Sequence, residues 1–239
     1  MCTDAYFFGV VMKKLLNYFS KGEIILWVSS VILIVLSFLI FDRGSYATLF
    51  ASLIGITALI FCAKGNPIGQ VLIIIFSLIY GAISYSFSYY GEMATYLGMS
   101  MPMAVFSLIT WLRHPYKDNK SEVKVNSISK KEHLLMWPLT AIVTVIFYFI
   151  LAYFGTANLI PSTLSVSTSF LAVYLTSRRS PFYALAYAAN DIILIVLWVL
   201  ASLHDTSYIS VVVCFIAFLS NDIYGFVNWQ RMKKRQANG

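Results

Sequence analysis

Two aspartates stand inside long apolar stretches of this sequence, and an asparagine directly precedes each of them, as Asn190-Asp191 and Asn221-Asp222. An ionisable side chain at the centre of a bilayer costs about 2.5–3.5 kcal/mol on insertion scales, so such groups face a bundle interior or a water-filled cavity. Substrate contact, proton transfer and a purely structural hydrogen bond all remain open for the two carboxyl groups.

Paired carboxyl groups in neighbouring membrane helices can also activate water, as in intramembrane aspartyl proteases. Those enzymes carry a Gly-x-Gly-Asp sequence, whereas Asp191 ends Ala-Ala-Asn-Asp and Asp222 ends Leu-Ser-Asn-Asp. The two aspartates also fall at different depths of their apolar runs, which argues against contact between them. An aspartyl protease that uses both residues is therefore kept as the alternative from a different class of protein.

Amide and tyrosine side chains recur at helical spacing around these aspartates. Tyr183, Tyr187 and Asn190 fall on one stripe of a helix, and Asn221 and Tyr224 fall on another. Such side chains suit a ligand with a flat ring and a sugar, because rings stack on aromatic faces and sugar hydroxyls need donors and acceptors together. A cationic ring would also gain from a nearby carboxylate or aromatic face.

The candidate substrate-binding residues come from these stripes and from two further apolar runs that carry polar groups. They are Asn190, Asn221, Tyr183, Tyr187, Gln70, Ser77, Tyr80, Thr168, Asp191 and Tyr224. For isolated hydroxyls, hydrogen bonding between helices is the simpler explanation. No catalytic residue, metal site or cofactor is expected, because the cysteines and histidines show no ligand spacing and no Walker A sequence is present.

Composition decides which class of protein must position these residues. Hydrophobic residues make up 59% of the 239 residues and charged residues 11%, whereas a soluble domain carries about 25% charged residues. A membrane span needs roughly 20 mostly apolar residues. We therefore predict an all-α integral membrane protein of about eight helices, with a short interfacial helix at 5–20. The expected spans are 23–41, 46–63, 67–88, 94–112, 134–154, 160–177, 181–203 and 207–229.

The basic residues orient these spans. Every Lys and Arg except Arg43 falls on the side of the two termini when eight spans are drawn. Cytoplasmic loops carry an excess of Lys and Arg. Both termini, the central loop and the Arg178-Arg179 turn are therefore expected in the cytoplasm, and the protein in the plasma (inner) membrane as a multi-pass protein. This topology also explains the net charge of +7 without any nucleic-acid partner.

The two halves of the chain share landmarks in the same order. A basic residue precedes Pro67 and Pro181, where the third and seventh spans open, and Trp111 and Trp229 close the fourth and eighth spans, each followed closely by an arginine. This order predicts a 3+1+3 parallel repeat with one extra N-terminal helix and a special site between the halves near the midplane. The expected division is 1–22 cytoplasmic or interfacial start, 23–44 extra helix, 45–113 first three-helix repeat, 114–159 loop and linker helix, 160–232 second three-helix repeat, and 233–239 cytoplasmic tail.

Several stretches resemble one family, the PnuC vitamin transporters, over roughly residues 45–232. They are KGNPIGQVLIIIFSLIYGAISYSFSYYGEMATYLGMSMP at 64–102, TWLR at 110–113 and SNDIYGFVNWQRM at 220–232. The resemblance implies a SWEET-related bundle, and Asn190 and Asn221 match intramembrane asparagines of the family. Many members have a Trp-rich opening of the seventh span where this chain has Phe182 and Tyr183, so Tyr183 or Tyr187 is expected to stack on the substrate.

The function that this resemblance implies is uptake of nicotinamide riboside, an NAD precursor, by facilitated diffusion with alternating access. Phosphorylation would trap the substrate in the cytoplasm, which makes a cytoplasmic kinase a functional partner. Relatives carry thiamine, riboflavin or deoxynucleosides, and these remain alternative substrates. Proton coupling through Asp191, a role as the binding subunit of an ATP-driven uptake system, and assembly into a homo-oligomer also stay open.

Overall fold

The computed structural model describes residues 18–86, 90–117, 119–156 and 158–239, and the interfacial helix expected at 5–20 lies almost wholly outside these residues. Within the described part of the chain, eight helical segments are long and apolar enough to cross a membrane, as predicted. They are α2 (Lys21–Phe41), α3 (Tyr46–Ala63), α4 (Ile68–Ser86), the composite α5 (Tyr90–Thr95), η1 (Tyr96–Ser100) and α6 (Met101–Arg113), then α7 (Lys130–Tyr153), α8 (Leu159–Ser177), α9 (Phe182–Ser202) and α10 (Ile209–Asn238), the last preceded by the 3₁₀ turn η2 (Thr206–Tyr208).

Two helices begin earlier than their apolar runs, and a capping box explains each start. Ser129 accepts a hydrogen bond from the backbone N–H of Glu132 while the Glu132 side chain accepts one from the Ser129 N–H, so α7 begins at Lys130. Ser20 and Glu23 form the same box at the start of α2. A capping box satisfies backbone donors that would otherwise lack partners, which allows a helix to start among polar residues.

The fourth span contains a π-helical turn that hydropathy did not indicate. Residues Tyr96–Ser100 are π-helical, and the Met101 N–H bonds to the Tyr96 carbonyl. Pro102 follows in the first turn of α6 and has no N–H to give to the turn before it. A widened turn just before a proline is a common way to accommodate that loss, and π-bulges often lie at functional sites.

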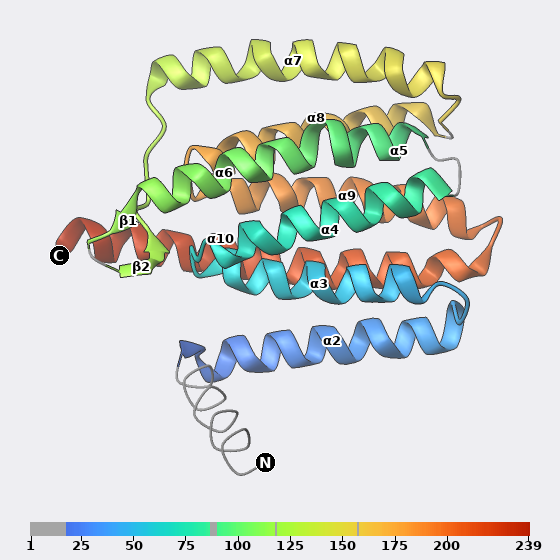
Figure 1. Cartoon of the computed structure of the whole chain (residues 1–239), viewed down its shortest axis with the longest axis horizontal. Coiled ribbons are helices and arrows are strands. Elements are labelled where there is room, and N and C mark those ends of the chain that lie inside the picture. Colours follow the sequence, from blue (N-terminus) through green and yellow to red (C-terminus); the bar gives the residue numbers. More distant parts are fainter. Residues whose placement is uncertain (1–17, 87–89, 118, 157) are drawn as a thin grey trace.

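The central polar segment folds into a small hairpin rather than the plain loop that we predicted. β1 (Pro115–Tyr116) pairs antiparallel with β2 (Asn119–Val123). Val123 is fully buried, and its N–H donates to the Gly65 carbonyl at 2.9 Å. Arg235 near the end of α10 forms an ion pair with Glu122. The hairpin therefore closes the end of the bundle where α10 ends (Figure 1).

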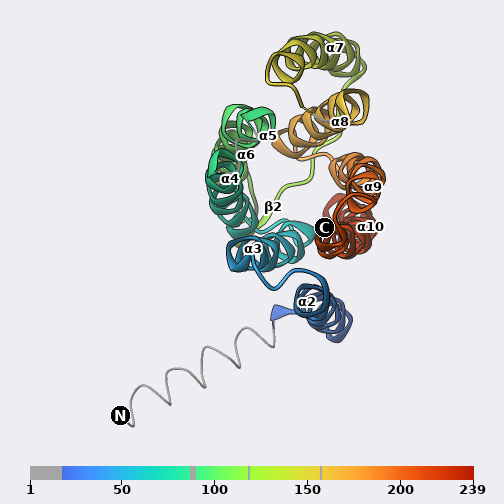
Figure 2. The same ribbon diagram turned by 90° about the vertical axis from the view of Figure 1, so that its right-hand side faces the viewer.

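The helices form two walls when the bundle is viewed along its length (Figure 2). One wall contains α4, α5 and α6, and the other contains α8, α9 and α10. The helix α3 packs on both α4 and α10, and α8 packs on α6 and α9, so the two walls are joined at both edges. The helix α7 packs on α8 outside the walls, and α2 packs on α3 and α10.

Candidate functional site

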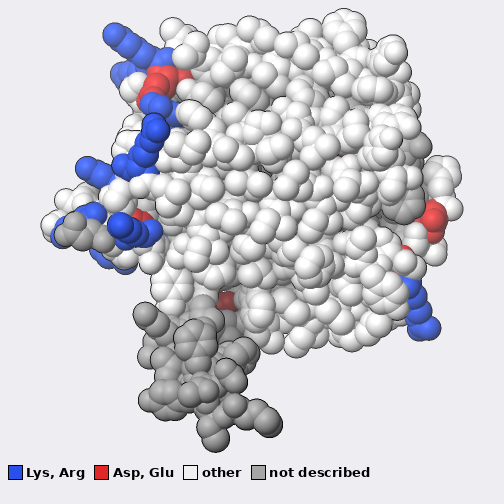
Figure 3. All heavy atoms as spheres, viewed as in Figure 1, with Lys and Arg blue, Asp and Glu red and all other residues white. Residues whose placement is uncertain are grey.

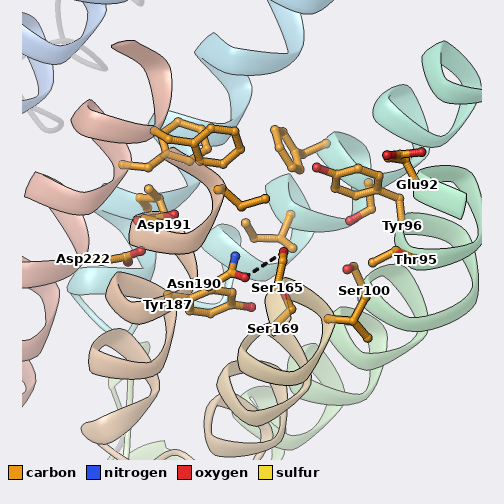
Figure 4. A pocket seen from close by; sticks show the side chains of 18 of the residues that line it. Glu92, Thr95, Tyr96, Ser100, Ser165, Ser169, Tyr187, Asn190, Asp191 and Asp222 are labelled. Carbon is orange, nitrogen blue, oxygen red and sulfur yellow. Dashed lines mark hydrogen bonds between the residues drawn. The ribbon is translucent and has the colours of Figure 1, made fainter. Parts of the chain in front are cut away.

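A cavity of about 170 Å³ lies between the two walls (Figure 4). It is lined from α3, α4, the α5–η1 segment, α7, α8, α9 and α10. Cys62 and Asp222 line the part of the cavity nearer to the C-terminal end of the bundle. Glu92 and Trp198 line the part nearer to the opposite end. The cavity therefore lies between helices from the first half of the chain and helices from the second half.

Asp191 and Asp222 meet in this cavity. The two residues are 3% and 4% exposed and lie near each other in the cavity (Figure 4), and their carboxyl groups are within hydrogen-bonding reach. Our prediction that different depths would keep them apart is wrong. The helices α9 and α10 run antiparallel from a short connection, and both aspartates lie at nearly the same distance from that connection along their helices.

Asn190 projects into the cavity from the turn next to this pair. Its Oδ1 accepts hydrogen bonds from the Ser165 Oγ at 3.1 Å and the Thr168 Oγ1 at 2.9 Å (Figure 4). Two hydroxyl donors on the oxygen fix the orientation of the amide. The Nδ2 group has no protein acceptor among the described residues, so it is free to donate to a ligand.

Four further candidates line the cavity with Asn190 and Asp191. Gln70 on α4 donates to the Cys62 Sγ at 3.3 Å, and Ser77, one to two turns further along α4, is 1% exposed and its Oγ has no partner among the described residues. The Tyr183 and Tyr187 rings lie edge to face with centroids 6.2 Å apart. All four side chains contribute to the lining.

The remaining four candidates do not line the cavity. Asn221 points toward α2, where its Nδ2 donates to the Ser30 Oγ at 3.0 Å. Tyr224 donates to the Glu23 carboxylate at 2.8 Å. Thr168 reaches the site only through Asn190, and Tyr80 lies behind the lining, against Tyr96 with ring centroids 5.2 Å apart.

Several lining residues were missed by sequence reasoning. Glu92 was expected in the loop between the third and fourth spans, yet it lies in α5 and lines the cavity. Tyr96 lies in the π-helical turn, which no hydropathy pattern marks. Phe76, Trp198 and Phe218 read as ordinary apolar span residues and also line the cavity. The one sequence signal for Glu92 as a site residue was its position directly before a long apolar run.

The electrostatic character of the cavity is acidic. Among its described lining residues are the carboxyl groups of Glu92, Asp191 and Asp222, and neither a lysine nor an arginine. In a low-dielectric cleft, charges of one sign concentrate ligands of the opposite sign. The aromatic lining adds faces that also attract cations.

Membrane-spanning helices around a largely apolar cavity that carries three carboxyl groups define a transporter-like membrane protein. The model of the family described as nicotinamide mononucleotide transporter matches residues 45–231, and the chain belongs to this family. The nicotinamide riboside transporter PnuC of Neisseria mucosa is 25% identical over 203 residues, which cover 83% of this chain and 77% of that protein. The fold is that of the vitamin B3 transporter PnuC, whose crystal structure has a TM-score of 0.78 and 22% identity over 91% of this chain and 94% of the other.

These comparisons confirm the PnuC family resemblance that the sequence motifs indicated. The chain is a multi-pass integral membrane transporter of the PnuC type, and its relatives are transporters rather than aspartyl proteases. The Asp191–Asp222 contact therefore needs an explanation within a transporter.

Proposed function

We propose that this transporter carries nicotinamide riboside, and the observation that supports this substrate most strongly is the acidic cavity. The riboside combines a positively charged pyridinium ring with an uncharged sugar, whereas the mononucleotide adds a negatively charged phosphate. Phosphate groups are usually bound by arginine, lysine or helix N-termini. The described cavity lining offers three carboxyl groups and no basic side chain, which favours the riboside over the mononucleotide.

The same argument ranks the other candidate substrates. Thiamine is also a cation and stays the strongest competitor, whereas riboflavin and deoxynucleosides are uncharged and gain nothing from the carboxyl groups. We assign the ring to the aromatic lining around Tyr187 and the sugar or carboxamide oxygens to Asn190 Nδ2, Ser77 and Gln70. Each of these lining groups can form hydrogen bonds, and Tyr183 and Asp191 are the other candidates that line the cavity.

Alternating access about a 3+1+3 repeat, with α7 as the linker and α2 as the extra helix, is the transport mechanism that we propose. Matched geometry in the two halves supports it. Gly65 and Arg179, each two residues before a helix-opening proline, have positive φ angles of 66° and 58°. The end of β2 and the segment after it bond to both turns, through Val123 N–H to the Gly65 carbonyl and Asn126 N–H to the Arg179 carbonyl, each at 2.9 Å.

The distribution of positive charge supports an orientation of the protein in the membrane. Lysines and arginines gather at the end of the bundle where the chain ends (Figure 3), which supports cytoplasmic termini in a plasma membrane. Trp111 and Trp229 pack at that end, and the cavity extends toward the opposite end. We propose facilitated diffusion into the cell, with the substrate trapped by a cytoplasmic kinase that phosphorylates it.

Calorimetry on the purified protein tests the substrate. Nicotinamide riboside, its mononucleotide, thiamine, riboflavin and a deoxynucleoside are titrated in parallel. We expect the riboside to bind at least tenfold more tightly than the mononucleotide, a difference of about 1.4 kcal/mol or more. Asn190→Ala should weaken the riboside at least tenfold, and Asn119→Ala on the exposed hairpin should not. Equal binding of the mononucleotide would refute the electrostatic argument, and binding of thiamine alone would reassign the substrate.

A further inference from the structure

The contact between Asp191 and Asp222 requires that the pair of carboxyl groups carry a proton. An ionised carboxylate only accepts hydrogen bonds, so two carboxyl groups can bond to each other only when one of them carries a proton. Two negative charges at this distance in a buried site would repel each other strongly. The hydrogen-bonded pair therefore holds at least one proton.

The groups around the pair do not supply a compensating charge. Cys62 faces Asp222 from α3, Tyr183 and Tyr187 face it from α9, and Cys214 on α10 lies near Asp191. Thiol and phenol groups ionise at about 8.5 and 10 in water, so these neighbours are neutral at pH 7. Gln70, the nearby polar residue of α4, is uncharged as well.

A second polar group in the same cavity has a hydrogen-bonding capacity that a ligand could satisfy. Ser77 is buried, its hydroxyl has no partner among the described residues, and it lines the cavity together with both aspartates. A buried hydroxyl without a partner costs free energy unless a ligand or water completes it. The aspartate pair is thus part of the ligand-binding cavity and not an isolated structural contact.

We propose that a proton and the cationic ring of the substrate compete for the Asp191–Asp222 pair. When the cation enters, the O–H bond of the protonated carboxyl breaks and the proton leaves through the cavity to water. The pair gains one negative charge while the ligand brings one positive charge, so the total charge of the occupied site is unchanged. This inference rests on the proposed riboside substrate and adds an exchange of one cation for one proton.

Linkage fixes the direction of the pH effect. A ligand that favours the unprotonated pair is itself favoured by removal of the proton, by the same factor. The affinity for nicotinamide riboside should therefore rise with pH and fall in acid. An uncharged ligand of the cavity would release no proton and would show no such dependence.

Calorimetry in two buffers of different ionisation enthalpy at the same pH measures the released proton directly. The apparent enthalpy of riboside binding should differ between the buffers by an amount that corresponds to release of up to one proton per riboside. The double variant Asp191→Asn/Asp222→Asn should abolish this difference. Asp205→Asn is the matched control and should retain it, because Asp205 is an exposed cap of η2 and asparagine caps equally well. Equal enthalpies in both buffers would overturn the competition.

A second measurement examines the resident proton without any ligand. Infrared spectroscopy of the purified protein should show the carbonyl band of a buried protonated carboxyl group, weaker in the Asp191→Asn/Asp222→Asn double variant and unchanged in Asp205→Asn. Absence of the band from the unsubstituted protein would overturn the proposal. Riboside that fails to bind in every buffer would refute the proposed function and the competition together, whereas binding without proton release would refute the competition alone.

Discussion

Trp111 and Trp229 pack against each other with ring centroids 5.4 Å apart, and each donates its indole N–H across to the other half of the bundle. Trp111 Nε1 bonds to the Thr176 carbonyl at the end of α8, and Trp229 Nε1 bonds to the Cys62 carbonyl at the end of α3, both at 2.9 Å. The two acceptors occupy equivalent places before Pro181 and Pro67. The two indole groups therefore hold the two walls together at the end of the bundle where α6, α8 and α10 end.

Removal of one of these indole donors should loosen that end of the bundle. Trp229→Phe keeps an aromatic ring but removes the indole donor, while the Cys62 carbonyl still accepts the Gly65 N–H. Loss of one such hydrogen bond costs about 0.5–1.5 kcal/mol. Thermal unfolding in detergent should show a lower midpoint for Trp229→Phe and for Trp111→Phe. Trp137→Phe, at an exposed position of α7, serves as the control. An unchanged midpoint in both core variants would show that the reciprocal bonds do not contribute.

The hydroxyl of Thr168 should matter for binding although it does not line the cavity. Thr168→Val removes a donor to the Asn190 Oδ1, so the amide loses part of its fixed orientation. We expect riboside binding to weaken about three- to tenfold, which corresponds to about 0.7–1.4 kcal/mol. Thr110→Val removes a hydroxyl that bonds only to its own helix, at the Phe106 carbonyl, and should bind normally. Equal affinities of the two variants would argue against the positioning role.

Substitution of two buried serines should distinguish an effect on substrate binding from an effect on stability. Ser77 and Ser107 are each 1% exposed and lack a hydroxyl partner among the described residues, but only Ser77 lines the cavity. Replacement by alanine should leave stability unchanged or raise it by about 1 kcal/mol in both cases, because an unsatisfied hydroxyl is removed. Riboside affinity should fall for Ser77→Ala and stay constant for Ser107→Ala. The opposite pattern in a calorimetric titration would remove Ser77 from the site.

The helix α2 is attached to the bundle by an ion pair whose acidic partner is buried. Glu23 is 2% exposed, accepts from the Lys64 Nζ at 3.1 Å and from the Tyr224 hydroxyl at 2.8 Å, and thereby joins α2 to α3 and α10. Glu23→Ala leaves Lys64 without its partner, and because the Lys64 side chain is partly exposed the loss should stay below the roughly 3–5 kcal/mol of a fully buried pair.

The chain contains a matched control for this substitution. Glu132 also closes a capping box and pairs with an arginine, Arg178, but both side chains are partly exposed to solvent. Exposed pairs contribute about 0–1 kcal/mol, although loss of the box costs both variants a similar amount. Unfolding in detergent should therefore show a clearly larger loss for Glu23→Ala than for Glu132→Ala. Similar losses would mean that the burial of Glu23 adds nothing.

The order and length of the spans could be predicted because they depend on local composition. Runs of about 20 apolar residues need a membrane, whatever their neighbours are. The eight predicted spans are all present as helices, and their ends differ where capping residues extend a helix or a proline alters one. The hairpin at 115–123 escaped prediction, because its short strands are held by docking under α3 and α10 rather than by their own pattern.

The candidate site was predicted in part, and adjacent residues show why. Asn221 and Asp222 follow each other in α10, so their side chains point about 100° apart around the helix axis. Asn221 bonds to Ser30 of α2, and Asp222 reaches Asp191 in the cavity. The sequence by itself determined that these polar groups lie in the membrane and that their helices must hide them. Only the tertiary structure decided which face of α10 meets the cavity, because that depends on how α2, α3 and α9 pack around it.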